Sequence, residues 1–446
     1  MAGALRVLAL ACPLLDVASM LGLVLTAGGA RGAYQAGVLK RIGELPSLAG
    51  MPSPFPIITG ASAGAINGSA IAARSGDFRE ATAELARLWA QLQVEHVFHT
   101  DAVSLSMGAL RFVRDMALGS VLGSTLSQAL LDATPLRGFL ARALPLDGIA
   151  DGIRDGHLYA VAILATSYHS GRSFTFVQGR PGHPIWVKSR RVVLPVRLTV
   201  DHVCASAAIP IVFPPVPLPS SVGDVYFGDG ALRLVTPLSP AIRLGATHVF
   251  GIGIRSQRAA DSLWQEELGV GSEAPEHAEG MPSPPMAQIC GVFLNAIFLD
   301  HLDADLDHLR RMNELIQSYA RERPPAPRPA ADGTPVEPMR VVSPLVVSPS
   351  EDLALVAQRF AHRMPRLVRF LLDGLGTPDA QSADLTSYLL FDPFYTRTLM
   401  DIGYRDASAR IDEIEAFLQD GMAAARAIGR VEGASLDDAG EERAVG

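Results

Sequence analysis

The sequence is poor in cysteine and in charge. Its 446 residues include only Cys12, Cys204 and Cys290, too few and too scattered for a disulfide framework or a cysteine-based metal cluster. A reducing compartment is therefore the better expectation. Charged side chains make up 19% of the residues, the formal net charge is −8, and no basic run occurs. A mildly acidic chain of this kind does not fit a nucleic-acid-binding protein.

The chain has no shortage of apolar material. Hydrophobic residues make up 48% of it, which excludes a wholly disordered or fibrous protein. A length of 446 residues suits two or three domains or one large α/β domain. The 41 glycines and 32 prolines indicate many turns and loops. We find no internal repeat, and nothing in the sequence points to a particular oligomeric state.

The first twenty residues have an ambiguous apolar character. Apolar segments at 7–15 and 17–30 are together long enough for a membrane span, but Pro13 and Asp16 interrupt them. A signal peptide needs a positive start, and Arg6 is the only basic side chain there. We expect residues 1–20 to be a leader or N-terminal extension, with a targeting role as the less favoured alternative. The expected location is the cytoplasm or the periphery of a membrane.

Two strand–turn–helix units follow in succession. Residues 21–26 and 55–59 are short apolar runs that end in glycine, and 33–45 and 65–74 have helical spacing. Such a succession predicts an α/β fold with a parallel sheet. Further strands are expected at 158–166, 173–177, 225–227, 248–254 and 339–347.

The rest of the chain is expected to be helices and connections. The segment 103–143 is rich in Leu, Ala and Met and mostly helical in pattern, and apolar residues at 294–319 predict a long amphipathic helix. Two more helices are expected, at 353–371 with a kink at Pro365 and at 411–418. The remaining expectations are an exposed loop at about 256–285, a Pro-rich connection at about 321–338, a C-terminal helical region at 351–430 and a disordered tail at 431–446.

The strongest local signal is a Gly-x-Ser-x-Gly pentapeptide, Gly60-Ala61-Ser62-Ala63-Gly64. Between a strand and a helix this is the pattern of a nucleophile elbow. Gly60 and Gly64 are needed because the tight turn brings other backbone close to their α-carbons. Ser62 is then exposed at a strained turn, next to a helix N-terminus that favours developing negative charge. An ordinary Gly/Ser turn is the competing interpretation.

A second loop, Gly28-Gly29-Ala30-Arg31-Gly32, also lies after a strand and before a helix. Its backbone N–H groups can converge on an anion. The spacing does not fit the dinucleotide fingerprint, and the Gly-Lys-Ser/Thr of a phosphate loop is missing. An oxyanion hole that serves Ser62 explains both loops at once.

A nucleophilic serine needs a base, and no histidine offers an obvious one. His301 and His308 lie among several aspartates on the expected long helix, where a solvated face is favoured over a metal site. Asp229, flanked by Gly228 and Gly230 after a short apolar strand, is the better candidate. Taken alone, Asp229 would be read as an ordinary turn residue.

Taken in order, these motifs resemble those of the patatin-like phospholipases. The loop 28–32 and the following 32–39 look like the oxyanion loop of that family, 60–64 like its elbow and 229–231 like its Asp-Gly-Gly/Ala motif. The stretch Ala205–Pro210 with Phe213-Pro214-Pro215 is similar to the block upstream of that aspartate. The resemblance covers about residues 21–255. Ala27 departs from it, because the family usually has glycine there.

The resemblance implies a three-layer α/β/α fold with a mostly parallel central sheet and additional C-terminal helices, with a catalytic domain at 21–350. It also implies a lipid acyl hydrolase, of phospholipase A or lysophospholipase type, without metal or organic cofactor. Ser62 would attack an ester and Asp229 would take its proton. The amides of Gly28, Gly29 and Ala30, with Arg31 supporting the loop, would stabilise the oxyanion. Its partner would be a lipid or phospholipid substrate, with peripheral membrane contact as an expectation. Independently of the resemblance, the apolar segments 103–143 and 209–219 are expected to line an acyl pocket or to touch a bilayer surface, although core packing explains them equally well.

Three alternatives remain open. A catalytically silent lipid-binding protein is disfavoured by the intact Ser62 and Asp229. An acyltransferase could use the same acyl-enzyme, although malonyl-transfer enzymes normally carry a histidine where this chain has Ala61. A hydrolase with a Ser-His-Asp triad would need a catalytic histidine.

Overall fold

The computed structural model describes residues 20–99, 129–256 except 189 and 222, 301–322, 340–369 except 367, and 386–424. Several expectations lie outside these residues: the leader at 1–19, most of the helical pattern at 103–143, the loop after 256, the Pro-rich connection after 322 and the tail at 431–446.

A single mixed sheet forms the centre of the fold. Among the described residues ten strands join in the order β10-β9-β1-β2-β3-β4-β6-β5, while β8 pairs with β3 and β7 pairs with β8. The strands are β1 (Leu21–Leu25), β2 (Ile57–Ala61), β3 (Ala160–Ser167), β4 (Ser173–Gly179), β5 (Val187–Lys188), β6 (Arg191–Pro195), β7 (Val216–Ser220), β8 (Gly223–Asp229), β9 (His248–Ile252) and β10 (Ser343–Val347).

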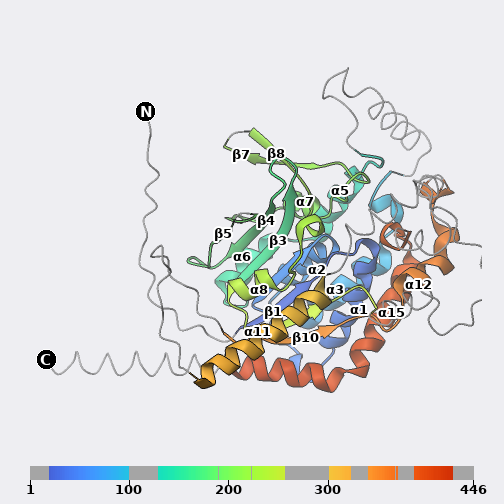
Figure 1. Cartoon of the computed structure of the whole chain (residues 1–446). Helices are drawn as coiled ribbons and strands as arrows, with labels where there is room; N and C mark the ends of the chain where they lie inside the picture. Colours follow the sequence, from blue (N-terminus) through green and yellow to red (C-terminus); the bar gives the residue numbers. More distant parts are fainter. Residues whose placement is uncertain are drawn as a thin grey trace, which may run out of the picture.

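Helices connect and cover these strands (Figure 1). They are α1 (Gly32–Gly43), α2 (Ala63–Ala72), α3 (Phe78–Gln91), α5 (Thr134–Ala143), α6 (Asp147–Arg154), α7 (Val200–Ser206), α8 (Ser239–Leu244), α11 (Leu302–Glu322), α12 (Leu353–Phe360), α15 (Pro393–Ala409) and a last helix over 411–424. In the described part of the chain no helix is both long and apolar enough to cross a membrane.

The core of the sheet is parallel, as expected. Strand β1 pairs in parallel with β2 and β9, β2 pairs in parallel with β3, and β9 pairs in parallel with β10. Strands buried on both faces read as continuous apolar runs, which is why the five residues of β1 are all hydrophobic or glycine. Antiparallel pairs join β3 to β4 and to β8, β5 to β6, and β7 to β8.

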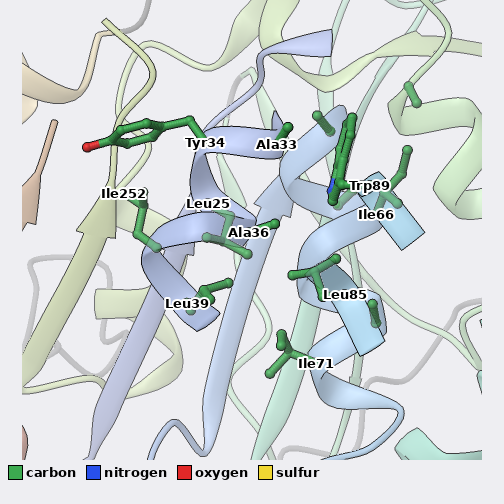
Figure 2. Packing of buried hydrophobic residues seen from close by; sticks show 14 of the residues in the cluster. Leu25, Ala33, Tyr34, Ala36, Leu39, Ile66, Ile71, Leu85, Trp89 and Ile252 are labelled. Atoms are coloured by element: carbon green, nitrogen blue, oxygen red, sulfur yellow. The ribbon is translucent and has the colours of Figure 1, made fainter. Parts of the chain in front are cut away.

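The side chains of each central strand alternate between two helical layers. Leu23 and Leu25 of β1 belong to the hydrophobic cluster that includes α1, α2 and α3, whereas Val24 packs with residues of α8 and α11 on the other face. Figure 2 shows the first cluster, in which Ala36 and Leu39 of α1 lie over the strands near Leu25. The three-layer α/β/α architecture is therefore confirmed.

The C-terminal helix α15 packs closely against α1. A Cβ added at Gly37 would lie 2.0 Å from the carbonyl oxygen of Met400, and one added at Gly403 would lie 2.2 Å from that of Tyr34. Glycine on both helices thus permits a contact that any side chain would block. As a result, α15 shares the layer of α1 and α3.

Two of the differences from the predicted helices lie in the C-terminal part of the chain. The periodicity over 353–371 predicts one kinked helix, but α12 ends at Phe360 and a 3₁₀ turn follows before Pro365, which lacks an N–H to continue it. Helix α15 was missed by periodicity, although its start carries a local signal. Asp392 accepts hydrogen bonds from the N–H groups of Phe394 and Tyr395, and Pro393 occupies the first turn.

Candidate active site

The ends of β2 and β8 meet at one edge of β3. Ala61, the last residue of β2, pairs in parallel with Leu164, and Asp229, the last residue of β8, pairs in antiparallel fashion with Ala165. Because Leu164 and Ala165 are adjacent in β3, the two strands converge from opposite directions. This convergence brings Ser62 and Asp229 together although 166 residues separate them in the chain.

Ser62 lies at a strained turn between β2 and α2. Its backbone has φ 53° and ψ −123°, a region that residues with a side chain rarely occupy. The turn is so tight that a Cβ at Gly60 would lie 2.2 Å from the carbonyl oxygen of Gly64, and one at Gly64 would lie 2.2 Å from that of Leu25. A side chain at either glycine of the pentapeptide would therefore clash with neighbouring backbone.

The Ser62 side chain is hydrogen-bonded to a held carboxylate. Ser62 Oγ donates to Asp229 Oδ2 over 2.7 Å, and both residues are buried. The other oxygen, Asp229 Oδ1, accepts from the N–H of Ala231 over 2.8 Å. The Thr166 hydroxyl donates to the Asp229 backbone carbonyl over 3.0 Å. With both oxygens engaged, the carboxylate has a fixed orientation toward the serine.

Burial favours the neutral form of the Asp229 carboxyl group. Removal from water raises the pKa of Asp229 from 3.8 to about 6, although the hydrogen bonds from Ala231 and Ser62 oppose the rise. At pH 7 the group is still mostly ionised and able to accept a proton. A base with a pKa just below the working pH suits general base catalysis.

Among the described histidines, none hydrogen-bonds to Ser62 or Asp229. His202 pairs with Thr199, and His248 with Asp420. The described residues also contain no group of three or more His, Cys, Asp or Glu side chains that could hold a metal ion. On α11, Asp305 instead accepts the N–H of Leu238 at the start of α8 over 2.8 Å.

The glycine-rich loop lies beside Ser62. Gly29 lines the same pocket as Ser62 and has φ 51°, and a Cβ at Gly32 would lie 2.7 Å from that of Ala63. Within the turn, the N–H of Arg31 donates to the Gly28 carbonyl, and that of Gly32 to the carbonyls of Gly29 and Ala30. Within this turn the N–H groups of Arg31 and Gly32 are therefore engaged, which leaves those of Gly28, Gly29 and Ala30 as candidates to bind a ligand.

Sequence reasoning did not assign a role to Ser206. The N–H of Ser62 donates to Ser206 Oγ over 3.0 Å, and that hydroxyl donates in turn to the Leu164 carbonyl. Ser206 thus ties the elbow to β3 at the residue that pairs with Ala61. The Ala205–Pro210 block contained it, but nothing in the sequence distinguishes its hydroxyl from that of any other serine in a helix.

The contacts of Arg31 could not be foreseen either. Its Nε donates to Ser387 Oγ over 2.7 Å, and its guanidinium carbon lies 4.4 Å from the centre of the Tyr388 ring. Arg31 is 2% exposed. These partners lie in the C-terminal part of the chain, where no motif marks them.

An apolar pocket opens beside the serine. Helix α5 and the segment after α7 supply parts of its wall, so both apolar segments noted in the sequence contribute side chains to it. Its other walls come from α2, α3 and the C-terminal part of the chain. It is lined by Gly29, Ser62, Ala63, Ile66, Leu88, Trp89, Leu92, Val97, Leu136, Phe139, Leu140, Ala207, Ile209, Phe213 and Phe391.

A family model described as Patatin-like phospholipase matches residues 23–242. These residues form a patatin-like phospholipase domain. The patatin-like domain thus contains the elbow, the glycine-rich loop and Asp229, whereas α11, α12 and α15 lie beyond the match. The description of the family names phospholipases, which are enzymes that act on lipids.

Two solved structures are similar to the patatin-like chain. VipD from Legionella pneumophila is 11% identical, with a TM-score of 0.25, and the match covers 86% of this chain and 67% of that one. Human GIVD cytosolic phospholipase A2, solved in complex with a fluorophosphonate inhibitor, is 12% identical with a TM-score of 0.39. That match covers 92% of this chain and 60% of the phospholipase chain. No curated protein matches this chain in sequence.

Proposed function

We propose that the protein is a serine lipid acyl hydrolase, of phospholipase A or lysophospholipase type, in which Ser62 and Asp229 form a catalytic dyad. The observation that carries the proposal is the 2.7 Å hydrogen bond from Ser62 Oγ to Asp229 Oδ2, next to an apolar pocket. A serine at a strained elbow with a held carboxylate has the parts that nucleophilic catalysis requires.

In the first half of the reaction, Ser62 Oγ attacks the ester carbonyl carbon. Its proton passes to Asp229 Oδ2 as the new carbon–oxygen bond forms, and Asp229 then returns the proton to the leaving alkoxide as the ester bond breaks. In the second half, water attacks the acyl-enzyme and gives a proton to Asp229. The fatty acid leaves and Ser62 regains its hydrogen.

Negative charge develops on the carbonyl oxygen in both halves. The amides of Gly29 and Ala30 are the proposed donors to this oxygen, with Gly28, Arg31 and Gly32 shaping the turn that presents them. Two donors that point at a developing charge stabilise it far more strongly in a site without water than in bulk water, because no solvent must reorganise.

The pocket wall favours an acyl chain as the bound part of the substrate. Its lining is aliphatic and aromatic apart from the Ser62 hydroxyl and backbone groups. Phe213 belongs both to this wall and to an outer groove with Tyr168 and Ile211, which are 44% and 39% exposed. A lipid could pass from a bilayer surface over this groove to Ser62, so we propose peripheral membrane contact there.

The test is incubation of the purified protein with mixed phospholipids, followed by identification of the acyl products. Released fatty acid supports hydrolysis, whereas an acyl group recovered on another acceptor would favour a transferase. Ser62→Ala and Asp229→Asn should each lower turnover by on the order of 10³-fold, and the double variant should be little worse, because the pair acts as a unit. Full activity in Ser62→Ala would refute the assignment.

A further inference from the structure

The C-terminal part of the chain contacts the glycine-rich loop directly. A Cβ at Gly29 would lie 2.3 Å from the backbone carbonyl oxygen of Tyr388, so only glycine fits against this segment. Two residues along, the Arg31 guanidinium donates to Ser387 Oγ and lies over the Tyr388 ring. Both partners are far beyond residue 242, where the family match ends.

This contacting segment is itself firmly held. Ser387 is fully buried and Tyr388 is 3% exposed. The buried hydroxyl of Tyr395, at the start of α15, lies 3.3 Å from the Leu353 carbonyl and 3.4 Å from that of Ser387. Because α15 packs tightly on α1, the segment and the glycine-rich loop are fixed to the same layer.

The same segment also closes the pocket. Phe391 lines it together with Ser62 and Gly29. Its ring meets that of Phe98 edge-on, with the centroids 6.4 Å apart. Phe391 is 7% exposed, so its ring is packed inside the protein as part of the pocket wall.

We propose that residues 387–391 complete the active site from outside the family domain, which rests on the proposed function. Ser387 and Tyr388 are positioning residues: they hold Arg31, and through it the turn whose Gly29 and Ala30 amides face the oxyanion. A displacement of about 1 Å in such a turn lowers the stabilisation of the transition state more than it lowers the affinity for substrate. Phe391 is a specificity-determining residue that limits the acyl length the pocket accepts.

The chain offers a matched control for the first role. Arg41 Nε donates to Ser408 Oγ over 3.0 Å. This pair has the same two residue types, but it joins α1 to α15 away from the pocket. With p-nitrophenyl butyrate as substrate, Ser387→Ala should lower kcat about tenfold with KM changed less than twofold and the pH profile unshifted. Ser408→Ala should leave kcat within twofold, and Ser387→Thr should restore most of the loss. Equal kcat in the two alanine variants would overturn the positioning role.

The second role is tested with p-nitrophenyl esters from butyrate to palmitate. Phe391→Ala should raise the ratio of kcat/KM for long over short chains about tenfold, whereas Phe394→Ala, at a 54% exposed site, should not change it. An unchanged ratio in Phe391→Ala would refute the pocket role, even if Ser387→Ala failed to fold. A wild-type protein that neither turns over esters nor reacts with a fluorophosphonate would instead refute the proposed function itself.

Discussion

Asp229→Asn should make the protein more stable at alkaline pH while it removes activity. Burial raises the pKa of Asp229 from 3.8 to about 6. Above pH 6 the folded state therefore carries a buried charge that the unfolded chain exposes to water. Each tenfold change in the proton equilibrium is worth about 1.4 kcal/mol, so this charge costs the fold about 3 kcal/mol. Asparagine has nearly the same shape and can still accept from Ala231 and donate to Ser62 Oγ.

The pH dependence gives the prediction its sign. A carboxyl group with a raised pKa in the folded state destabilises the fold at high pH, and the wild type recovers this loss as protons bind between pH 6 and about pH 4. The advantage of Asp229→Asn in the free energy of unfolding should therefore be about 3 kcal/mol at pH 8 and close to zero near pH 4. Urea unfolding of both proteins at pH 8, 6 and 4.5 measures it.

Activity should depend on the same ionisation of Asp229, but it should fall with decreasing pH where the stability of the wild type rises. The wild-type kcat/KM should fall about tenfold for each pH unit below 6, because the protonated carboxyl cannot accept the serine proton. Two results would refute the reasoning. One is a stability advantage of Asp229→Asn that does not depend on pH, and the other is an acidic limb of the activity profile centred near pH 4.

Three further outcomes are expected. Ser62→Gly should abolish ester hydrolysis. Its free energy of unfolding should nevertheless be about 1 kcal/mol higher than that of Ser62→Ala, because glycine relieves the backbone strain at φ 53°; thermal unfolding of the two variants measures the difference. Gly29→Val should reduce both turnover and the melting temperature, because its Cβ would lie 2.3 Å from the Tyr388 carbonyl oxygen. A variant with unchanged turnover and an unchanged melting temperature would contradict the contact between this loop and Tyr388. Ile211→Asp should weaken sedimentation with phospholipid vesicles but leave p-nitrophenyl butyrate hydrolysis unchanged.

The elbow could be located from sequence because its requirements are local. Gly60 and Gly64 face backbone atoms at positions set by the turn itself and by the neighbouring strand β1. The predicted strand 55–59 and helix from 65 left a short loop around Ser62. In the structure β2 runs to Ala61 and α2 begins at Ala63, so Ser62 alone makes the turn. Periodicity misses this tightness because alanine and glycine carry little hydrophobic signal.

The partners of Arg31 could not be predicted by the same means. Ser387 and Tyr388 lie more than 350 residues away and belong to no long periodic element, so neither spacing nor composition marks them. Their role depends on α15 packing against α1, which in turn depends on Gly37 and Gly403. A glycine that permits helix contact looks in sequence like any other helical glycine, and only the three-dimensional contact distinguishes it.

The pairing of Ser62 with Asp229 depends on the register of a strand rather than on either motif. Asp229 faces Ser62 because β8 pairs with β3 at Ala165, one residue beyond the place where β2 ends. A slip of one residue would turn the carboxylate to the opposite face of the sheet. The register is fixed by the N–H of Asp229 bonded to the Ala208 carbonyl and by the Thr166 hydroxyl bonded to the Asp229 carbonyl. The Ala205–Pro210 block therefore acts on the proposed dyad through the Ala208 carbonyl, which holds Asp229, and the Ser206 hydroxyl, which holds Ser62. This accounts for a stretch without catalytic side chains beside the two motifs that have them.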